Sequence, residues 1–316
     1  MFTTINIAFA AKSGGIGIGP YQNDVNDKRA WLVYDNIKPG QEIKDKVVIS
    51  NDMDEAVTLL VYPVDAHIIE DGGYAPDQDD VAPIDVGAWT EVLQKEVSLA
   101  PGEKKIVNFI IKVPKVVGVG DHAGTILIRR MVPTKVLDKD QTTGEMVENG
   151  MSVITRVGTR IYLNVAGKKL PSLSFDRLAF EKNAKGEPSF YFSISNNGNI
   201  RLDPSANVEI YSADGLKLMQ TFDVNLKEVL PGDKTKIEIK WEKPLDGAFI
   251  VKAKISDPND AAKFLNQETK FEWKVSGING AEVIAGVPIT NLVILGGIIV
   301  LLLFMVVIKL LVRRIY

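Results

Sequence analysis

The chain has 316 residues, of which 46% are hydrophobic and 24% charged, and its formal net charge at pH 7 is −3. This composition supports packed cores and more than one domain, while the small negative charge gives no electrostatic footprint for nucleic acid. The absence of cysteine excludes disulfides, thiol catalysis and zinc–thiolate sites.

Residues 1–26 are expected to be the end of a signal peptide followed by a flexible leader. Ala8 and Ala10 form an A-x-A cleavage pattern after a short apolar stretch. Because that stretch has no basic start, we expect the signal to begin upstream; an ordinary flexible N-terminus is the alternative. The glycine-rich run at 14–20 superficially resembles a phosphate loop, but it lacks the lysine and is assigned to the leader.

Three Pro-Gly pairs are each followed by a polar residue and then by alternating apolar and polar residues. In a type II turn, proline presets the first φ and glycine accepts the positive φ that follows. The alternation predicts a strand with one face in a core and the other in water. We therefore expect the same sandwich corner to recur, with three unrelated hairpin turns as the alternative. The pairs are Pro39-Gly40, Pro101-Gly102 and Pro231-Gly232.

The strand-like segments group into two β-sandwiches, a first over residues 27–167 and a second over residues 168–275. Turn residues separate the segments at intervals close to those of immunoglobulin-like sandwiches. The polar segment 136–149 is expected to be a hairpin tip of the first sandwich, whereas Trp241 and Trp273 are expected in the core of the second. The predicted fold class is all-β, with two tandem immunoglobulin-like sandwiches and a single C-terminal transmembrane helix.

The C-terminal region is expected to hold the chain in a membrane. After a glycine-containing linker at 276–288, the uncharged run 289–308 is long enough to cross a bilayer, since about 20 helical residues span the ~30 Å hydrocarbon layer. The basic tail 309–316 is expected in the cytoplasm, because positive residues stay on that side. The protein is then single-pass in the cell membrane, with its bulk outside the cell. The residues assigned to the anchor and its flank are Ile289, Leu292, Ile308, Lys309, Arg313 and Arg314.

No catalytic constellation stands out, so we expect neither enzyme activity nor a cofactor. The histidines, His67 and His122, are isolated, and with no thiols available the sequence argues against a zinc site. Acidic residues cluster in two polar loops, and carboxylates spaced by two can bind Ca²⁺ when a loop curls them inward. Solvated loop tips are the alternative. The weak Ca²⁺ candidates are Asp77, Asp79, Asp138 and Asp140.

Several segments follow one another in an order that resembles a known family. "WLVYDNIKPGQEIKDKVVISND" from Trp31 has a Pro-Gly turn leading into a strand, and "WTEVLQKEVSLAPGEKKIVNFIIKVP" from Trp89 has a V-x-L-x-PGE-strand-Pro pattern. "FYFSISNNGNIRLDPSANVEIYSADG" from Phe190 has a strand, an Asn-Gly-Asn turn and a second strand. Together they resemble the WxL-interacting surface proteins of Gram-positive bacteria over most of the chain. The resemblance implies a first domain that binds peptidoglycan and a second that binds a host or partner protein.

The expected function is a membrane-anchored surface protein that binds or scaffolds, attaching through its sandwiches to peptidoglycan or to another surface protein. Sandwiches offer edge strands and end loops to partners. Trp31, Tyr74 and Trp89 are candidate partner-binding residues near such loops, although each also suits a core. The alternative is a pilus or surface-assembly chaperone, or a structural component, that acts by strand addition. An exported hydrolase is a third hypothesis, which would need a carboxylate pair or an activated nucleophile.

Overall fold

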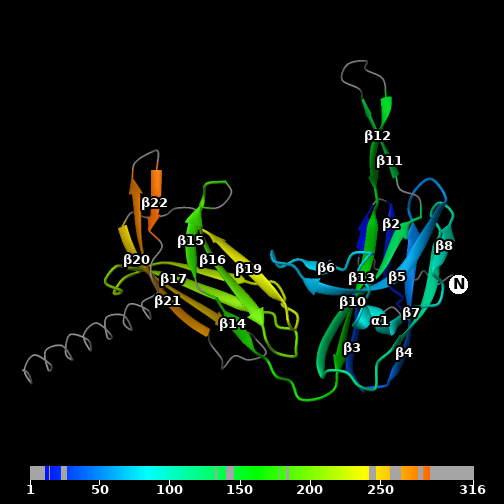
Figure 1. Ribbon diagram of the computed structural model, residues 1–316, viewed down its shortest axis with the longest axis horizontal. Coiled ribbons are helices and arrows are strands. Elements are labelled where there is room, and N and C mark those ends of the chain that lie inside the picture. Colours follow the sequence, from blue (N-terminus) through cyan, green and yellow to red (C-terminus); the bar gives the residue numbers. More distant parts are fainter. Residues whose placement is uncertain are drawn as a thin grey trace, which may run out of the picture. The chain divides into compact units, whose positions relative to one another are not determined.

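The computed structural model of the chain is built from β-strands, with a short helix in the first half (Figure 1). It forms two compact units, each with its own hydrophobic core, and the chain passes from the first to the second at Leu170 and Pro171. The all-β class is therefore as expected. The residues that the structure describes are 11–13, 15–22, 27–131, 134–139, 146–176, 178–182, 185–241, 247–256, 265–276 and 280–284.

The predictions for both ends of the chain fall outside the described residues. These are the membrane segment 289–308 with its basic flank, and the cleavage pattern at Ala8 and Ala10. Within the part of the chain that is described, no helix has the length and apolar character needed to span a bilayer.

The first unit is a β-sandwich with a short helix at one end. Its elements are β1 (Ala11–Ser13), β2 (Ile16–Pro20), β3 (Leu32–Ile37), β4 (Glu42–Asn51), β5 (Val57–Ile68), β6 (Tyr74–Pro76), α1 (Val86–Trp89), β7 (Thr90–Val92), β8 (Glu96–Leu99), β9 (Lys104–Lys112), β10 (Gly120–Arg130) and β13 (Arg156–Val165). One sheet has the order β1-β2-β4-β9-β7, and the other β3-β13-β10-β5-β6 with β8 beside β5. Ile49, Phe109, Ile126 and Ile161 are fully buried in the core between these sheets.

β2 corrects the expectation that residues 1–26 form a leader without structure. It pairs with β4 from Ile16 opposite Asn51 to Pro20 opposite Val47, and Ile16 and Ile18 are fully buried in the core. The cause is the Ile-Gly-Ile-Gly alternation, because side chains two residues apart point to the same face of a strand. A glycine-rich run thus contributes a core strand.

The second unit is also a β-sandwich. Its strands are β14 (Leu173–Phe175), β15 (Ala179–Lys182), β16 (Pro188–Asn196), β17 (Ser205–Ser212), β18 (Leu218–Asn225), β19 (Lys234–Lys240), β20 (Gly247–Ser256), β21 (Leu265–Ser276) and β22 (Gly280–Ile284). One sheet has the order β14-β16-β15 with β19 also paired to β16, and the other β18-β17-β20-β21-β22. Aromatic rings fill much of the core, where Phe190 and Phe192 belong to the same cluster as Trp241. β22 corrects the expected flexible linker, since it pairs with β21.

Of the two tryptophans expected in this core, Trp241 is confirmed. Its side chain is 1% exposed, and its indole N–H donates to Gln220 at 2.8 Å. Phe190 stacks on it with ring centroids 5.5 Å apart. The side chain of Trp273, on β21, lies outside the described residues.

The three Pro-Gly corners confirm the turn prediction. Gly40, Gly102 and Gly232 have φ values of 79°, 72° and 84°, the left-handed region that glycine adopts most readily. Each corner precedes a strand, β4, β9 or β19, and is closed by a backbone hydrogen bond across the turn. The bonds are Gln41 N to Lys38 O (3.0 Å), Glu103 N to Ala100 O (3.0 Å) and Asp233 N to Leu230 O (3.1 Å).

In two of the corners a buried asparagine ties the turn to a neighbouring strand. Asn51 ends β4 and donates from its side chain to the Ala100 carbonyl at 3.0 Å; Asn196 ends β16 and donates to the Val229 carbonyl at 2.9 Å. The same two asparagines also donate their backbone N–H groups into the turns, to Glu103 and Asp233. The asparagine-tied form of the corner therefore occurs in both sandwiches, at Gly102 in the first and at Gly232 in the second.

A two-stranded ribbon continues the β10–β13 hairpin. β11 (Thr134–Lys139) pairs antiparallel with β12 (Met146–Val153), with an irregularity after Lys135. Figure 1 shows the ribbon extending beyond the two sheets of the first unit. The expectation that 136–149 is merely a hairpin tip is corrected, because most of that segment belongs to strands.

Candidate binding surfaces

Among the described residues of the first unit, an unpaired strand edge runs along β12 into β13. β3 pairs with β13 from Ile161, opposite Leu32, onwards. In the part of the chain that is described, no strand pairs with β13 before Ile161 on the side away from β10, or with β12 on the side away from β11. Because the ribbon continues the same hairpin, the two stretches form an edge without a paired strand in the described residues, the open edge, over 146–153 and 156–160. β1 and β2 lie near β13 without pairing with it.

The two faces beside this open edge differ in chemistry. Val157 and Thr159 point into the core and are at most 5% exposed, whereas Arg156 and Arg160 lie on the opposite, half-exposed face. The Thr159 hydroxyl is buried and has no hydrogen-bond partner among the described residues. A strand added here would therefore meet an apolar side and a cationic side.

Arg160 is held between two aromatic rings. Its guanidinium lies 4.8 Å from the ring centre of Trp31 and 4.2 Å from that of Tyr74, and it donates to the Tyr162 hydroxyl at 2.9 Å. The Tyr74 hydroxyl donates to the Gly124 carbonyl at 2.6 Å, which fixes that ring over β10. Cations over aromatic faces gain about 0.5–2 kcal/mol each, and a planar guanidinium suits such stacking. Trp31 and Tyr74, two of the predicted partner-binding residues, thus meet at the end of the open edge.

An ionic cluster lies at the other end of the β13 edge. Asp79 accepts hydrogen bonds from Arg156 at 2.8 Å and from the Tyr62 hydroxyl at 2.6 Å, with Arg129 at 3.4 Å. Burial alone would raise the pKa of Asp79, but these hydrogen bonds and the arginine charges outweigh it and hold the pKa below its ordinary value. Burial first, and the bond to Asp79 second, raise the pKa of Tyr62 to about 12.

Two of the four weak Ca²⁺ candidates, Asp77 and Asp79, have side chains that the structure describes. The Asp77 carboxylate lies 3.0 Å from His67 Nδ1, and Asp79 is engaged by arginines, so each already has a protein partner. The side chain of Asp138, on β11, and the whole of Asp140 lie outside the described residues. Over the described ranges, no group of three or more His, Asp or Glu side chains could hold a metal ion.

Trp89, the third predicted partner-binding residue, is separate from the other two. It ends α1 and packs against His122, with ring centroids 4.9 Å apart. His122 in turn contacts Asp85, in the segment that leads into α1. These residues lie at one end of the first sandwich.

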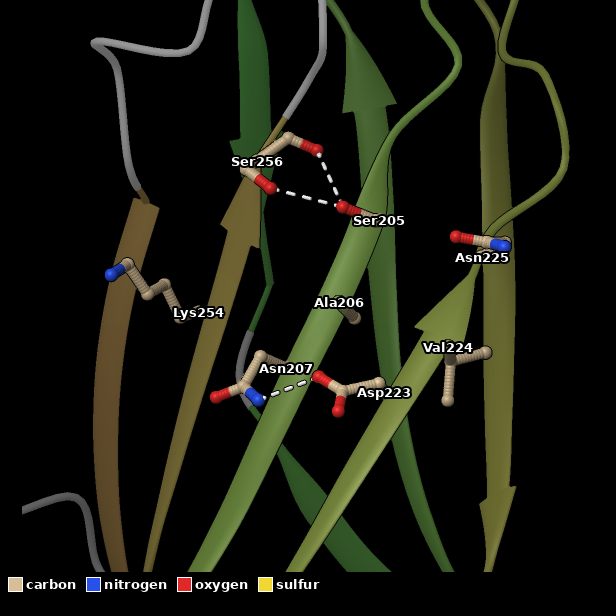
Figure 2. A pocket seen from close by; sticks show the side chains of 8 residues that line it. All are labelled: Ser205, Ala206, Asn207, Asp223, Val224, Asn225, Lys254 and Ser256. Carbon is tan, nitrogen blue, oxygen red and sulfur yellow. Dashed lines mark hydrogen bonds between the residues drawn. The ribbon is translucent and has the colours of Figure 1, made fainter.

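A shallow polar hollow lies on β17, β18 and β20 of the second unit (Figure 2). Asn207 donates to Asp223 at 2.8 Å, and the Ser205 and Ser256 hydroxyls lie 3.0 Å apart, as the dashed lines in Figure 2 show. These hydroxyl, amide and charged groups can hydrogen-bond a polar ligand, but they do not pair a nucleophile with a base. The lining residues are Ser205, Ala206, Asn207, Asp223, Val224, Asn225, Lys254 and Ser256.

Arg160 was not among the predicted binding residues. An arginine at an outward position of an alternating strand is expected in water, and nothing local distinguishes it from other surface arginines. The available signal was two aromatic residues, Trp31 at the start of a strand-like segment and Tyr74 in a glycine loop. Their meeting depends on long-range strand pairing, which the sequence alone does not specify.

Comparison with known proteins finds similarity in solved structures. No protein-family model and no curated protein sequence matches the chain. The chain is similar to a chaperone–tip adhesin complex of CFA/I fimbriae, at 15% identity and a TM-score of 0.40, covering 83% of this chain and 99% of that one. It is also similar to a Salmonella enterica structure of the SafA pilin with the SafB chaperone (8% identity, TM-score 0.36, 85% and 98% covered). A third structure is the CupB2 chaperone of Pseudomonas aeruginosa (13% identity, TM-score 0.35, 75% and 95% covered).

These findings correct the main functional expectation. Each of these solved structures is described as a chaperone or as a complex that contains one, and two of the chaperones are described together with a pilin or a tip adhesin. The expected scaffold attached to peptidoglycan has no counterpart among these structures, so that expectation is corrected. The alternative, surface assembly by strand addition, is left as a proposal. The resemblance to WxL-interacting proteins stays a prediction, since no family model bears on it.

Proposed function

We propose that the chain takes part in assembling another surface protein, by adding a strand of that partner to the open edge of β12 and β13. The observation that carries the proposal is the edge itself, over residues 146–153 and 156–160. Unpaired N–H and C=O groups along a strand are a template for pairing with another chain. Binding by strand addition draws its affinity from these backbone bonds and its selectivity from alternate side chains.

The ribbon gives the added strand a physical reason to bind. An isolated two-stranded ribbon is marginally stable in water, and a third strand would complete it. Each backbone hydrogen bond contributes about 0.5–1.5 kcal/mol net, so several bonds support a measurable affinity. β12 also carries neither lysine nor proline, the residues that commonly protect an edge strand from pairing.

The two faces of β13 indicate which residue types the added strand of the partner would carry. The side chains of the added strand on the side of Val157 and Thr159 would be apolar, and those on the side of Arg156 and Arg160 would be polar or acidic. The Trp31–Arg160–Tyr74 stack would lie beside the end of the added strand, because β3 occupies the edge from Ile161 onwards. The same proposal includes a single-pass membrane anchor at 289–308, with the sandwiches outside the cell. This part of the proposal is supported by the sequence alone.

Hydrogen exchange on the full chain tests the proposal. The probe is a pool of synthetic peptides with apolar residues at alternate positions, and the control pool has the same compositions in scrambled order. We expect the first pool to protect backbone amides within 146–160, while β18, an edge strand of the second unit, serves as the internal control. Binding that protects β18 equally, or that leaves residues 146–160 unprotected, would overturn the proposal.

A further inference from the structure

His122 joins two loops at one end of the first sandwich. Its Nδ1 lies 2.8 Å and 3.0 Å from the two carboxylate oxygens of Asp85, just before α1. Its Nε2 lies 3.0 Å from the carbonyl oxygen of Gly118, in the loop before β10. The imidazole therefore has a hydrogen-bond acceptor at each nitrogen.

This geometry fits the doubly protonated imidazole. A neutral imidazole carries one N–H, so in either tautomer one of its nitrogens would present a lone pair to an oxygen. Only the imidazolium donates to both Asp85 and Gly118. Trp89 from α1 covers the ring, and the charged groups that act on it are Asp85 and Asp121, both negative.

The two loops carry exposed apolar side chains. Ile84, next to Asp85, is 88% exposed, and Val116, two residues before Gly118, is 94% exposed. The segment before α1 has a second attachment, because Asp65 accepts the backbone N–H groups of Ile84 and Asp85. The loop at 114–119 also has attachments of its own, since Val117 packs against the core and Pro114 accepts the backbone N–H of Gly40. The bond from His122 to Gly118 is what ties this loop to the segment before α1.

We propose that His122, Asp85 and Gly118 form a proton-dependent clasp, which holds the loop at 114–119 against the segment at 84–89 while the imidazole carries both protons. Loss of one proton breaks one of the two hydrogen bonds, so the tie between Gly118 and the segment at 84–89 is released and the backbone around Gly118 opens, while Val117 and Pro114 keep the rest of the loop in place. The sandwich stays folded, because its core lies between the sheets. The clasp thereby controls how the end of the sandwich that bears Ile84 and Val116 is presented to a partner.

The electrostatics of the site agree with this clasp. Burial lowers the pKa of His122, but the hydrogen bond and charge of Asp85, the Gly118 carbonyl and Asp121 outweigh it and raise the pKa above its ordinary value. A raised pKa in the folded state means that the clasp is closed below the ordinary histidine pKa of about 6.5. It opens as the pH rises through the folded value.

The chain offers its own matched control, since His67 is its other histidine. His67 faces Asp77 at 3.0 Å with a side chain that is 47% exposed, compared with 18% for His122. We would label histidine selectively in the full chain, follow both rings by NMR between about pH 5 and 9, and measure amide exchange at 84–89 and 114–119. After correction for intrinsic rates, exchange at 114–119 should increase in step with deprotonation of His122.

The variants separate the clasp from general pH effects. His122→Gln should abolish the pH step at both segments, whereas His67→Gln should leave it unchanged. Asp85→Asn keeps an acceptor but removes its charge, so it should move the step to lower pH; this variant carries the test if His122→Gln does not fold. The proposal would be overturned if amide exchange at 114–119 did not change as His122 loses its proton. It would also be overturned if the pH-dependent change in exchange were the same in His122→Gln as in the unaltered chain.

Discussion

Asp65 offers a sharp test of how the first sandwich is held together at the α1 end. Its carboxylate is 8% exposed and accepts three backbone N–H groups, from Ile84 at 2.6 Å, Asp85 at 2.8 Å and Gly87 at 2.7 Å. The N-terminus of α1 has no side-chain cap from its own N-cap residue. Asp65, on β5, instead accepts hydrogen bonds from the backbone N–H groups at the start of the helix. The approach is close, since a Cβ on Gly87 would lie 2.5 Å from the Val64 backbone.

Replacing Asp65 with alanine leaves three donors without their charged acceptor. Hydrogen bonds to charged groups contribute about 1.5–3 kcal/mol each, and neighbouring bonds do not add fully. We therefore expect Asp65→Ala to lower the unfolding free energy of the first unit by about 3–5 kcal/mol, measured by denaturant unfolding of the full chain. Asp54→Ala, at an exposed loop position, is the matched control and should change it by less than about 0.5 kcal/mol. Equal effects of the two variants would refute the reasoning.

Three further predictions concern the effect of single substitutions on stability. Gly102→Ala and Gly232→Ala should each cost about 1–2 kcal/mol in denaturant unfolding, because both glycines have positive φ while an added Cβ would meet nothing within 4 Å; no loss would mean that the turns tolerate alanine. Arg160→Lys should lower stability by about 1–2 kcal/mol, since lysine keeps the charge but not the planar stack between two rings; an unchanged midpoint would show that charge alone matters. The depressed pKa of Asp79 adds stability above the ordinary carboxyl pKa of about 3.9, which is lost as pH falls through the folded value. Asp79→Asn should therefore flatten the acid limb of a stability–pH curve, and an identical limb would contradict this assignment.

The parts of the fold that depend on local sequence could be predicted. Pro-Gly followed by alternation specifies both a positive φ and a half-buried strand, so the corners at Gly40, Gly102 and Gly232 were predictable. Trp241 was predictable as a core residue for the same reason, because it follows an alternating strand. In each case the residues next to one another in the sequence determine the turn or the burial of the side chain.

The parts that depend on strand pairing could not be predicted in this way. β2 was missed because its glycines suggest a flexible loop, and only the pairing with β4 shows that Ile16 and Ile18 face a core. The open edge depends on where β3 begins to cover β13, at Leu32 opposite Ile161. The sequence patterns of these strands do not state which strands are neighbours.

The candidate binding residues also were predictable in their identity but not in their grouping. Trp31, Tyr74 and Trp89 were chosen as aromatic residues near loops, and the structure brings Trp31 and Tyr74 together around Arg160 but places Trp89 beside His122. Residue type therefore suggested the candidates, while tertiary contacts decided their grouping.

Cysteine mapping of the open edge tests the central claim most directly, because the chain has no cysteine of its own. Ile154, between β12 and β13, is 49% exposed, and Leu218, on the edge strand β18 of the second unit, is 48% exposed, so Ile154→Cys and Leu218→Cys form a matched pair. Each variant would be mixed with the alternating peptides carrying one terminal cysteine, and disulfide formation would be followed under mild oxidation. Strand addition at β12 and β13 predicts rapid cross-linking at position 154 and slow cross-linking at 218, with scrambled peptides slow at both. Equal rates at the two positions, or a faster rate at 218, would contradict it.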